Sequence, residues 1–197
     1  MKEDVLEQLV DDYLMSEGFF TVHNVKFGPL PGEEGFHKNK DNQQSDIDVL
    51  GFHPLRSAPD NVWVVSCKSW QSGFDVDSKI RSLRGGGIKK VNGKEAWKRF
   101  RELVKPKWKR ALVRTVTDLT GTSKFTHITA VTKVIGDPSK WETNKDFLKG
   151  LEGCRLRILS LTQMLDTLHS KLRTTPASSE IGRLLQLIKA SSWSLSK

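Results

Sequence analysis

Charged side chains interrupt two short, mostly apolar segments of the chain, and they are the residues best suited to chemistry. Asp46 and Asp48 lie in segment 45–51, and Lys68 lies in segment 62–70. Side chains alternate between the two faces of a β-strand, so the two aspartates share one face of the first strand. If the strands pair, two carboxylates and an ammonium converge. Such a group suits metal-dependent hydrolysis of a phosphodiester.

The same alternation places the neighbouring side chains. Ile47 and Val49 take the face opposite to the aspartates, while Ser66 shares the row of Lys68. An unpaired carboxylate inside an apolar strand is costly. A salt bridge between Asp48 and Lys68 is therefore the structural alternative to a functional site.

Positive charge is concentrated in one window of a chain whose formal net charge is +9. Residues 79–114 contain fourteen Lys and Arg against two acids, Glu95 and Glu102, so the window carries +12 and the remainder −3. A localised positive field is typical of proteins that bind a polyanion, nucleic acid first and an acidic membrane second. The alternative is a solvated helix face, but such a face usually mixes charges of both signs. The candidate nucleic-acid contacts are Lys79, Arg81, Arg84, Lys89, Lys90, Lys94, Lys98, Arg101, Lys105, Lys107, Lys109 and Arg110.

The length and the cysteine content bound the class of protein. A chain of 197 residues fits one domain that buries roughly 70% of its unfolded surface. Cys67 and Cys154 are too few for a disulfide framework and wrongly spaced for a zinc site. The five histidines lack metal-ligand spacing, and no apolar run approaches the ~20 residues that span a bilayer. We therefore expect a soluble, cytoplasmic protein that is not exported and has no membrane partner.

Hydrophobic spacing predicts an α/β fold with a mixed central sheet flanked by helices. Residues 71–87, which end in Gly85-Gly86-Gly87, are expected to form a mobile loop because they bury little apolar surface. Pro106 should break or kink a helix over residues 94–117. The expected helices are 3–17, 94–117, 138–148, 161–172 and 181–188, and the expected strands are 19–27, 45–52, 62–70, 124–135 and 154–161.

The expected domain spans residues 1–173 and contains a basic segment over residues 72–117. Residues 174–197 are expected to form a linker and an amphipathic C-terminal helix. The apolar stripe of this helix either docks on the domain or forms a homodimer contact.

Four elements of the chain carry a joint pattern of residues. Their members are Glu7, Val10, Tyr13, Leu14, Gly18, Phe19 and Asn24, then Asp46-Ile47-Asp48-Val49-Leu50 and Val64-Val65-Ser66-Cys67-Lys68. Taken in their joint spacing, these elements resemble the core of the PD-(D/E)XK nuclease superfamily, closest to its Holliday-junction-resolvase-like and Mrr-type group. The resemblance covers residues 3–70, and the later elements fit the order of a restriction-endonuclease-like αβββαβ core.

The resemblance implies a role for each matched residue. Asp48 matches the aspartate that bridges metal ions, and Lys68 matches the lysine that orients or activates the attacking water. Glu7 matches the helix glutamate that completes the metal site, and Cys67 would lend its backbone carbonyl to the metal. Asp46 is a further candidate ligand. These oxygen donors suit Mg²⁺, with Mn²⁺ as a substitute.

Ser66 departs from the family pattern, which usually places Glu, Asp or sometimes Gln at this position. A neutral hydroxyl is a weak metal ligand and removes one negative charge from the site. Three interpretations stay open: a tolerated variant, a carboxylate supplied instead by Asp46, Asp75 or Asp77, or a catalytically inactive binding domain.

The sequence therefore predicts a Mg²⁺-dependent nuclease, with DNA favoured over RNA as substrate. A second hypothesis is a nucleic-acid-binding or assembly protein that keeps the nuclease fold without turnover. A third is a basic protein that docks on acidic membranes or on a ribonucleoprotein through residues 79–114. Beside the predicted site, Trp70 either packs at the sheet edge or stacks on a base.

Overall fold

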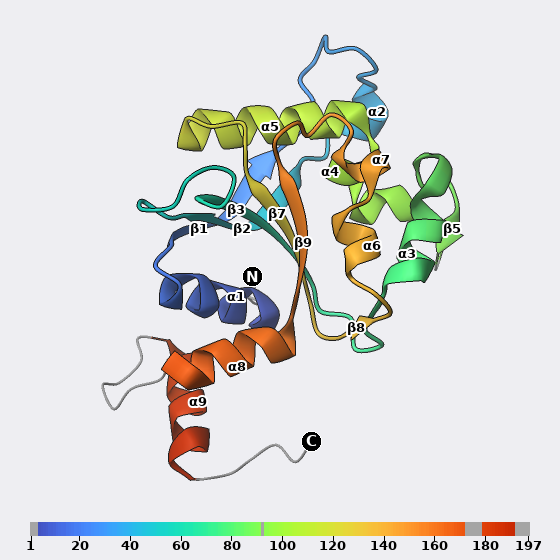
Figure 1. Ribbon diagram of the computed structural model, residues 1–197. Coiled ribbons are helices and arrows are strands. Elements are labelled where there is room, and N and C mark those ends of the chain that lie inside the picture. Colours follow the sequence, from blue (N-terminus) through green and yellow to red (C-terminus); the bar gives the residue numbers. More distant parts are fainter. Residues whose placement is uncertain (1–3, 92, 172–178, 192–197) are drawn as a thin grey trace.

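A mixed five-stranded sheet forms the centre of the protein, for which a computed structural model describes residues 4–91, 93–171 and 179–191 (Figure 1). The strands are, in spatial order, β1 (Phe20–Phe27), β2 (Ser45–Phe52), β3 (Val62–Lys68), β7 (Thr126–Val131) and β9 (Arg155–Ser160). β1, β2 and β3 pair antiparallel, whereas β7 and β9 continue the sheet parallel to β3. The predicted α/β class, with a mixed sheet flanked by helices, is confirmed.

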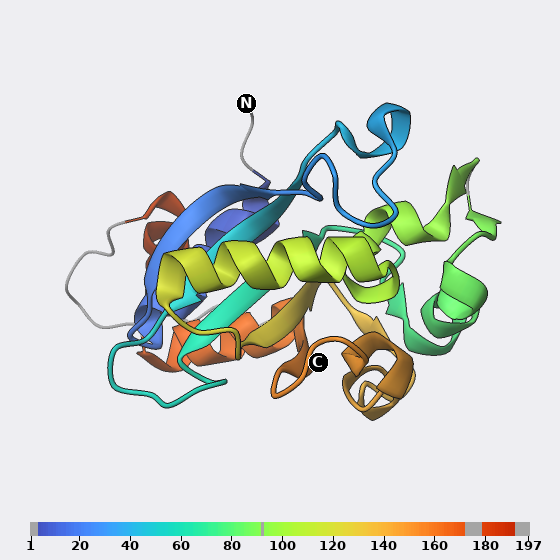
Figure 2. The ribbon, with the colours of Figure 1, turned by 90° about the horizontal axis from the view of Figure 1, so that it is seen from above.

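Helices cover both faces of this sheet, and one long helix crosses it (Figures 1 and 2). On one face, Leu14 and Met164 share a core with Val65. On the other face, Trp108 and Leu112 belong to a second core. The helices of the first face are α1 (Val5–Ser16) and α8 (Leu161–Lys171); those of the second are α3 (Val76–Leu83), α4 (Arg101–Val104), the long α5 (Pro106–Thr120), α6 (Ser139–Glu142) and α7 (Lys145–Leu148).

Shorter elements fill the connections. They comprise the helix α2 (Lys38–Asp41), the parallel strand pair β4 (Phe74–Asp75) and β8 (Val134–Ile135), the antiparallel pair β5 (Lys90–Val91) and β6 (Lys94–Glu95), and the 3₁₀ turns η1 (Arg84–Gly86) and η2 (Ala96–Arg99).

The prediction of a mobile loop over residues 71–87 is wrong, because this segment contains α3. Asp75 caps the helix by accepting a hydrogen bond from the Ser78 N–H at 2.8 Å. Val76 and Leu83 lie two turns apart on one face and are buried in the core. The surrounding Gly, Ser and Lys residues hid this short amphipathic pattern.

The predicted break at Pro106 is confirmed. The chain over residues 94–117 divides into η2, α4 and α5. Pro106 lies in the first turn of α5, where its missing N–H loses no helical hydrogen bond. The proline therefore begins a helix rather than kinking one.

The face assignment within β2 is wrong in one respect. Ile47 packs in the core beneath α5, whereas Val49 packs in the core beneath α1. In the register with β1, Asp48 falls opposite Asn24, whose φ is +54°. Asparagine adopts this left-handed conformation more readily than most residues. The two strands are therefore irregular at the level of Asp48.

The final helix, α9 (Glu180–Ala190), packs against α1 and α8. Ser179 Oγ donates a hydrogen bond to Asp12 at 2.5 Å, and Ile181 and Leu185 pack against the core. The helix thus docks on the domain, and the homodimer stays a prediction. Residues 174–178 of the expected linker and residues 192–197 lie outside the described residues. None of the described helices combines the length and apolar character that a membrane crossing requires.

Lys109 is a predicted nucleic-acid contact that lies instead in the interior. Its exposed fraction is 5%. Its Nζ donates to three backbone carbonyls, those of Asp146 (3.0 Å), Phe147 (2.7 Å) and Lys149 (2.6 Å). Burial lowers the pKa of Lys109 to about 8, so the side chain is still mostly protonated at neutral pH. Lys109 therefore joins α5 to the end of α7 and does not reach a phosphate.

Replacement of Lys109 by methionine should lower the free energy of unfolding by about 2 kcal/mol, because buried carbonyls lose a charged donor. Chemical denaturation followed by circular dichroism measures this change. Lys124→Met is the matched control, since Lys124 is exposed and its replacement should change stability by no more than about 0.5 kcal/mol. Equal stability of the two variants would contradict the structural role of Lys109.

Candidate active site

The candidate site lies where β2 and β3 separate. Their backbone pairing ends at Val49 and Val65. Asp48 directly precedes Val49 in β2, and its side chain replaces the missing backbone contact, because its Oδ2 accepts a hydrogen bond from the Cys67 N–H at 2.6 Å. The carboxylate is thereby held in the gap between the two strands.

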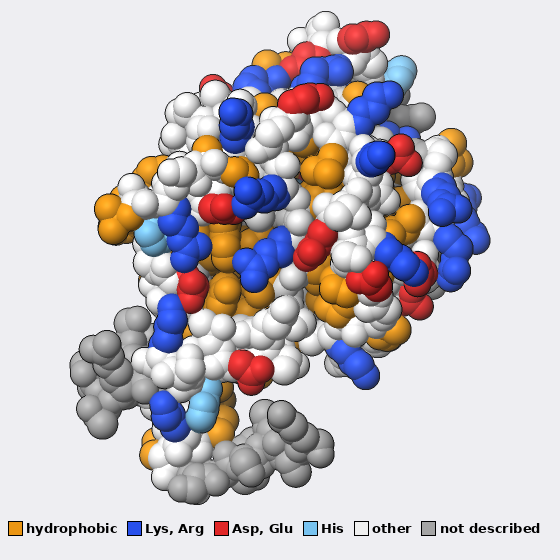
Figure 3. Space-filling model, viewed as in Figure 1, with side chains coloured by type: hydrophobic (Ala, Val, Ile, Leu, Met, Phe, Trp, Pro, Cys, Tyr) orange, Lys and Arg blue, Asp and Glu red, His pale blue; other side chains and the backbone are white. Residues whose placement is uncertain are grey.

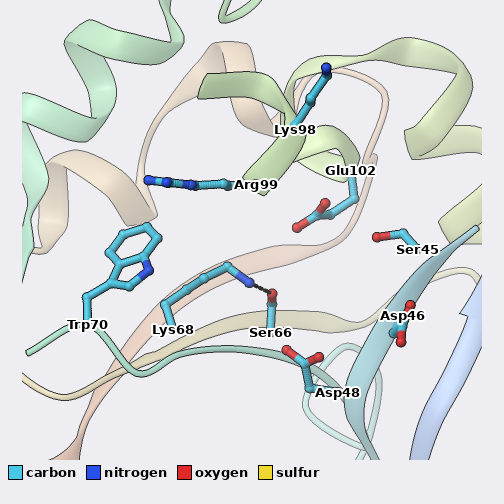
Figure 4. Close-up of a pocket in the computed structure, with 9 residues that line it drawn as sticks. All are labelled: Ser45, Asp46, Asp48, Ser66, Lys68, Trp70, Lys98, Arg99 and Glu102. Atoms are coloured by element: carbon cyan, nitrogen blue, oxygen red, sulfur yellow. Dashed lines mark hydrogen bonds between the residues drawn. The ribbon is translucent and has the colours of Figure 1, made fainter. Parts of the chain in front are cut away.

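A pocket of about 270 Å³ opens beside this gap (Figure 4). Its lining consists of Ser45, Asp46, Asp48, Ser66, Lys68, Trp70, Lys98, Arg99 and Glu102. Figure 4 shows the side chains of Asp48, Ser66, Lys68 and Glu102 turned toward one another from β2, β3 and α4. The structure therefore brings together Asp48, Ser66 and Lys68, three of the four predicted catalytic residues.

Asp48 lies in an environment that disfavours its charge. Burial raises the pKa of this carboxyl, and the charges of Glu102 and Asp46 raise it further. The charge of Lys68 and the Cys67 N–H act in the opposite direction without cancelling the effect. A cation close to Asp48 would therefore stabilise the ionised form of this carboxyl group.

Lys68 is held in place by two hydrogen bonds. Its Nζ donates to Ser66 Oγ at 2.6 Å (Figure 4) and to the Cys67 carbonyl at 3.2 Å. The same nitrogen lies 5.8 Å from the centroid of the Phe100 ring. Ser66 thus orients the lysine toward the pocket, and it does so without adding negative charge.

Glu102 is a second carboxylate of the pocket and is absent from the predicted site residues. It is 6% exposed, and its Oε1 lies 3.6 Å from Nε2 of His127 on β7. Burial alone would raise the pKa of Glu102, but its contact with His127 and the charges of His127 and Lys68 outweigh burial and lower it. The one sequence signal was an acid placed between Phe100 and Leu103 in an otherwise basic stretch.

The acids predicted to replace a carboxylate at position 66 have separate positions. Asp46 lines the pocket, and its carboxylate pairs with Lys26 on the neighbouring strand β1. Asp75 caps α3, and Asp77 pairs with Lys140 at 2.9 Å. The structure does not bring Asp75 and Asp77 to the pocket, because α3 holds them elsewhere.

Glu7 also lies outside this pocket. It belongs to α1, which covers the opposite face of the sheet, and it lines a separate pocket of about 410 Å³ with His23 and Asn24. Its charge still reaches Cys67: the pKa of this thiol is raised well above its usual range by burial, and then by the charges of Asp48 and Glu7. The thiol of Cys67 is therefore protonated at neutral pH.

The rim of the pocket is basic and aromatic. Lys98 and Arg99 line it from η2, across from Asp48 (Figure 4). Trp70 packs against other aromatic rings, as expected at a sheet edge, and the Nζ of Lys79 lies 4.1 Å from its ring centroid. The guanidinium of Arg99 lies 5.4 Å from the same centroid. Two cationic groups are therefore gathered around one indole at the mouth of the pocket.

The other predicted basic residues divide into exposed and anchored side chains. Figure 3 shows a cluster of Lys and Arg over the region of α3 and β5, to which Arg81, Arg84, Lys89 and Lys90 contribute exposed side chains. By contrast, Lys107 pairs with Asp41 at 2.6 Å, and Arg110 donates to the carbonyl of Glu34 at 3.2 Å. The side chain of Lys94 lies outside the described part of the chain.

Comparisons with protein-family models, with curated proteins and with solved structures give no match for this chain. Its function is therefore inferred from its own residues.

Two carboxylates of the pocket fit a divalent cation. Within the described residues, no three His, Cys, Asp or Glu side chains gather as a metal-binding group. Mg²⁺ needs only one or two carboxylates, because waters and substrate phosphates complete its shell. Asp48 and Glu102 meet this requirement, since both line the pocket and the charge of one acts on the other. The Cys67 carbonyl, a further predicted ligand, accepts the hydrogen bond from Lys68.

Replacement of Asp48 by asparagine should raise the midpoint of thermal unfolding at neutral pH. The pKa of Asp48 is higher in the folded protein than in the unfolded chain, so the folded state binds more protons between the two values. Stability from this group is present at low pH and is lost as the pH rises through that window. Asparagine keeps an oxygen acceptor for the Cys67 N–H and carries no charge.

Thermal unfolding at a series of pH values measures this effect, and Asp137→Asn is the control of opposite sign. Hydrogen bonds from Ser139 lower the pKa of the exposed Asp137, so loss of its charge should not stabilise the protein. An Asp48→Asn variant that unfolds at a lower temperature than the parent at neutral pH would refute the electrostatic description of the site.

Proposed function

We propose that this protein is a Mg²⁺-dependent nuclease that hydrolyses phosphodiester bonds, with DNA as the first polymer to test. The observation that carries the proposal is the convergence of Asp48, Glu102 and the Lys68 ammonium in one pocket with a basic rim. The order of the strands and the position of the pocket on β2 and β3 support a restriction-endonuclease-like core.

Asp48 and Glu102 would hold the cation. Bound Mg²⁺ supplies a polarised phosphoryl oxygen and a water of lowered pKa. Lys68 orients the attacking water and stabilises the negative charge that develops on the phosphate. Ser66 fixes the ammonium of Lys68, and His127 fixes the carboxylate of Glu102.

Glu102 supplies the carboxylate that is missing at position 66, where this chain has a serine. The family pattern places a carboxylate there, but Glu102 carries its negative charge into the same pocket from α4. Lys98 and Arg99 bind the phosphates next to the cleaved bond, since phosphate contacts fix the register of a strand. Glu7, another predicted metal ligand, has no role in this proposal because it lines a separate pocket.

A catalytically inactive nucleic-acid-binding protein with the same fold is the second candidate. It is favoured by the hydrogen bond between Lys68 and Ser66, and by the lack of a three-ligand metal group among the described residues. This candidate predicts that nucleic acid binds equally well in EDTA and in Mg²⁺, and that no substrate is cut.

Cleavage assays test the nuclease directly. Purified protein is incubated with Mg²⁺ or Mn²⁺ and with plasmid, linear duplex, single-stranded, branched and RNA substrates, and products are separated on gels. Asp48→Ala, Lys68→Ala and Glu102→Gln should each slow cleavage about 100-fold or more, the loss typical of one group that stabilises transition-state charge. Asp77→Asn, an exposed acid outside the pocket, should cut at the parental rate. If Asp48→Ala and Lys68→Ala cut as fast as the parent, the site assignment is wrong.

Metal binding is measured without turnover. Mg²⁺ or Mn²⁺ should raise the midpoint of thermal unfolding of the parent, because a ligand that binds only the folded state stabilises it. The increase should disappear in Asp48→Ala and persist in Asp77→Asn. A parent that shows no metal-dependent shift and cuts no substrate would favour the inactive binding protein.

A further inference from the structure

A second groove adjoins the candidate active site. It has a volume of about 460 Å³, within the range of pockets that hold small organic ligands. Its walls are residues 37–43, around α2, and residues of η2 and α4. Lys98 lines both this groove and the catalytic pocket, so the two cavities meet at its side chain.

Trp97 is the aromatic surface of this groove. Its indole is only partly buried, and the cationic groups of Lys105, Lys98 and Arg101 lie 5.2, 5.9 and 6.0 Å from its ring centroid. A partly exposed indole surrounded by cations is the combination that binds single-stranded nucleic acid, because a base stacks on the ring while cations hold the phosphates.

The groove carries excess positive charge. Each of its two acids faces a lysine: Asp41 lies 2.6 Å from Lys107, and Glu95 lies 3.5 Å from Lys98. Among the described residues, no carboxylate lies within ion-pair distance of Arg101 or Lys105. Arg101 donates two long hydrogen bonds, to the backbone carbonyls of Gln43 and Lys98 at 3.4 Å each, and its guanidinium lies over the Trp108 ring. The charges of Arg101 and Lys105 are therefore not neutralised by a carboxylate, and they attract an anionic ligand.

Amide side chains complete the lining. Asn39 and Gln43 are exposed at the groove and lie on the wall formed by residues 37–43. An amide offers both donors and an acceptor, the groups that pair with the edge of a nucleobase. A purely anionic partner without rings would use the cations and leave the indole and the amides without a role.

We propose that this groove binds an unpaired nucleobase stacked on Trp97, with the adjoining phosphates on Arg101 and Lys105. The inference rests on the proposed function, which places the cleaved phosphate next to Lys68. The strand then passes Lys98 into the groove. The preferred substrate is nucleic acid with an unpaired nucleotide beside the cleaved bond, because a paired base is not free to enter a side pocket.

Gly87 positions the indole. A Cβ at this residue would lie 2.8 Å from the backbone nitrogen and from the Cβ of Trp97, and its φ of +73° also disfavours a side chain. The Trp97 N–H donates to the Gly87 carbonyl at 3.2 Å. The glycine therefore permits a close backbone approach that fixes where the ring stands.

Binding in EDTA tests the groove without hydrolysis. Fluorescence anisotropy compares a blunt duplex, the same duplex with one unpaired base, the single strand, and heparin as a polyanion without bases. The parent should bind the substrates with unpaired bases about 10-fold more tightly than the blunt duplex, in line with one stacked base. Trp97→Ala should abolish this preference, Trp97→Phe should keep most of it, and heparin affinity should stay unchanged in both.

Two further variants sharpen the test. Gly87→Ala keeps the indole but displaces it, so it should also weaken the preference. Lys124→Ala removes an exposed lysine just before β7, at the end of the sheet remote from Lys68, and should leave the preference intact. Equal binding of all substrates by the parent, or a preference that survives Trp97→Ala, would refute the proposal that the groove binds an unpaired base. A Trp97→Ala variant that loses heparin affinity as much as nucleic-acid affinity would also refute it, because the groove would then bind negative charge alone.

The failure of each proposal is distinguishable. Loss of hydrolysis in every metal, with the base preference intact in EDTA, would overturn the nuclease and leave the base-binding groove. Hydrolysis that depends neither on unpaired bases nor on Trp97 would refute base binding in the groove but would still support the nuclease.

Discussion

The carboxylate of Asp48 replaces a backbone hydrogen bond at the point where β2 and β3 separate, and the rest of the site depends on this contact. A backbone N–H without a partner in a partly buried position is costly, and here an acidic side chain meets the need. The same contact prevents the carboxylate from turning toward solvent. Negative charge is therefore concentrated where burial opposes it, and the Lys68 ammonium compensates part of that charge.

Aromatic packing supports the opposite wall of the pocket. The rings of Phe74 and Phe100 lie 5.0 and 5.3 Å from that of Trp141, in edge-to-face contacts. Phe100 immediately precedes α4, a helix of four residues that is too short to be stable by its own hydrogen bonds. Tertiary packing therefore fixes α4, and with it the depth at which Glu102 meets His127.

Local patterns in the sequence predict most of the fold and the part of the site that lies on β2 and β3. The short, mostly apolar segments 45–52 and 62–70 identify β2 and β3, and the pairing of these strands brings Asp48 and Lys68 into one pocket. Local patterns do not predict contacts between segments that are distant in the sequence. Glu102 joins the site because tertiary packing places α4 where this carboxylate meets His127 of β7, which no local pattern of residues 94–117 reveals.

Lys109 is predicted to contact nucleic acid but is buried, whereas Glu102 lies in the site without being predicted there. It belongs to a basic stretch and has the composition of a surface residue, yet its acceptors lie 37 to 40 residues later in the chain. Charge counting along a sequence therefore overestimates the cations that face solvent, because it cannot identify those that bind carbonyl groups inside. Burial of an acid and of a lysine within one basic segment changes both the charge of the pocket and the charge of the surface.

Arg101 and Glu102 are consecutive residues of α4, yet they line different pockets. Consecutive helical side chains project about 100° apart, so a single turn serves two cavities. A ligand that displaces this turn from the side of Arg101 also moves the carboxylate of Glu102. Thermodynamic linkage makes such an effect reciprocal, so a cation on Glu102 would in turn alter affinity in the neighbouring groove. One helical turn thus gives this fold a short mechanical connection between its two neighbouring pockets.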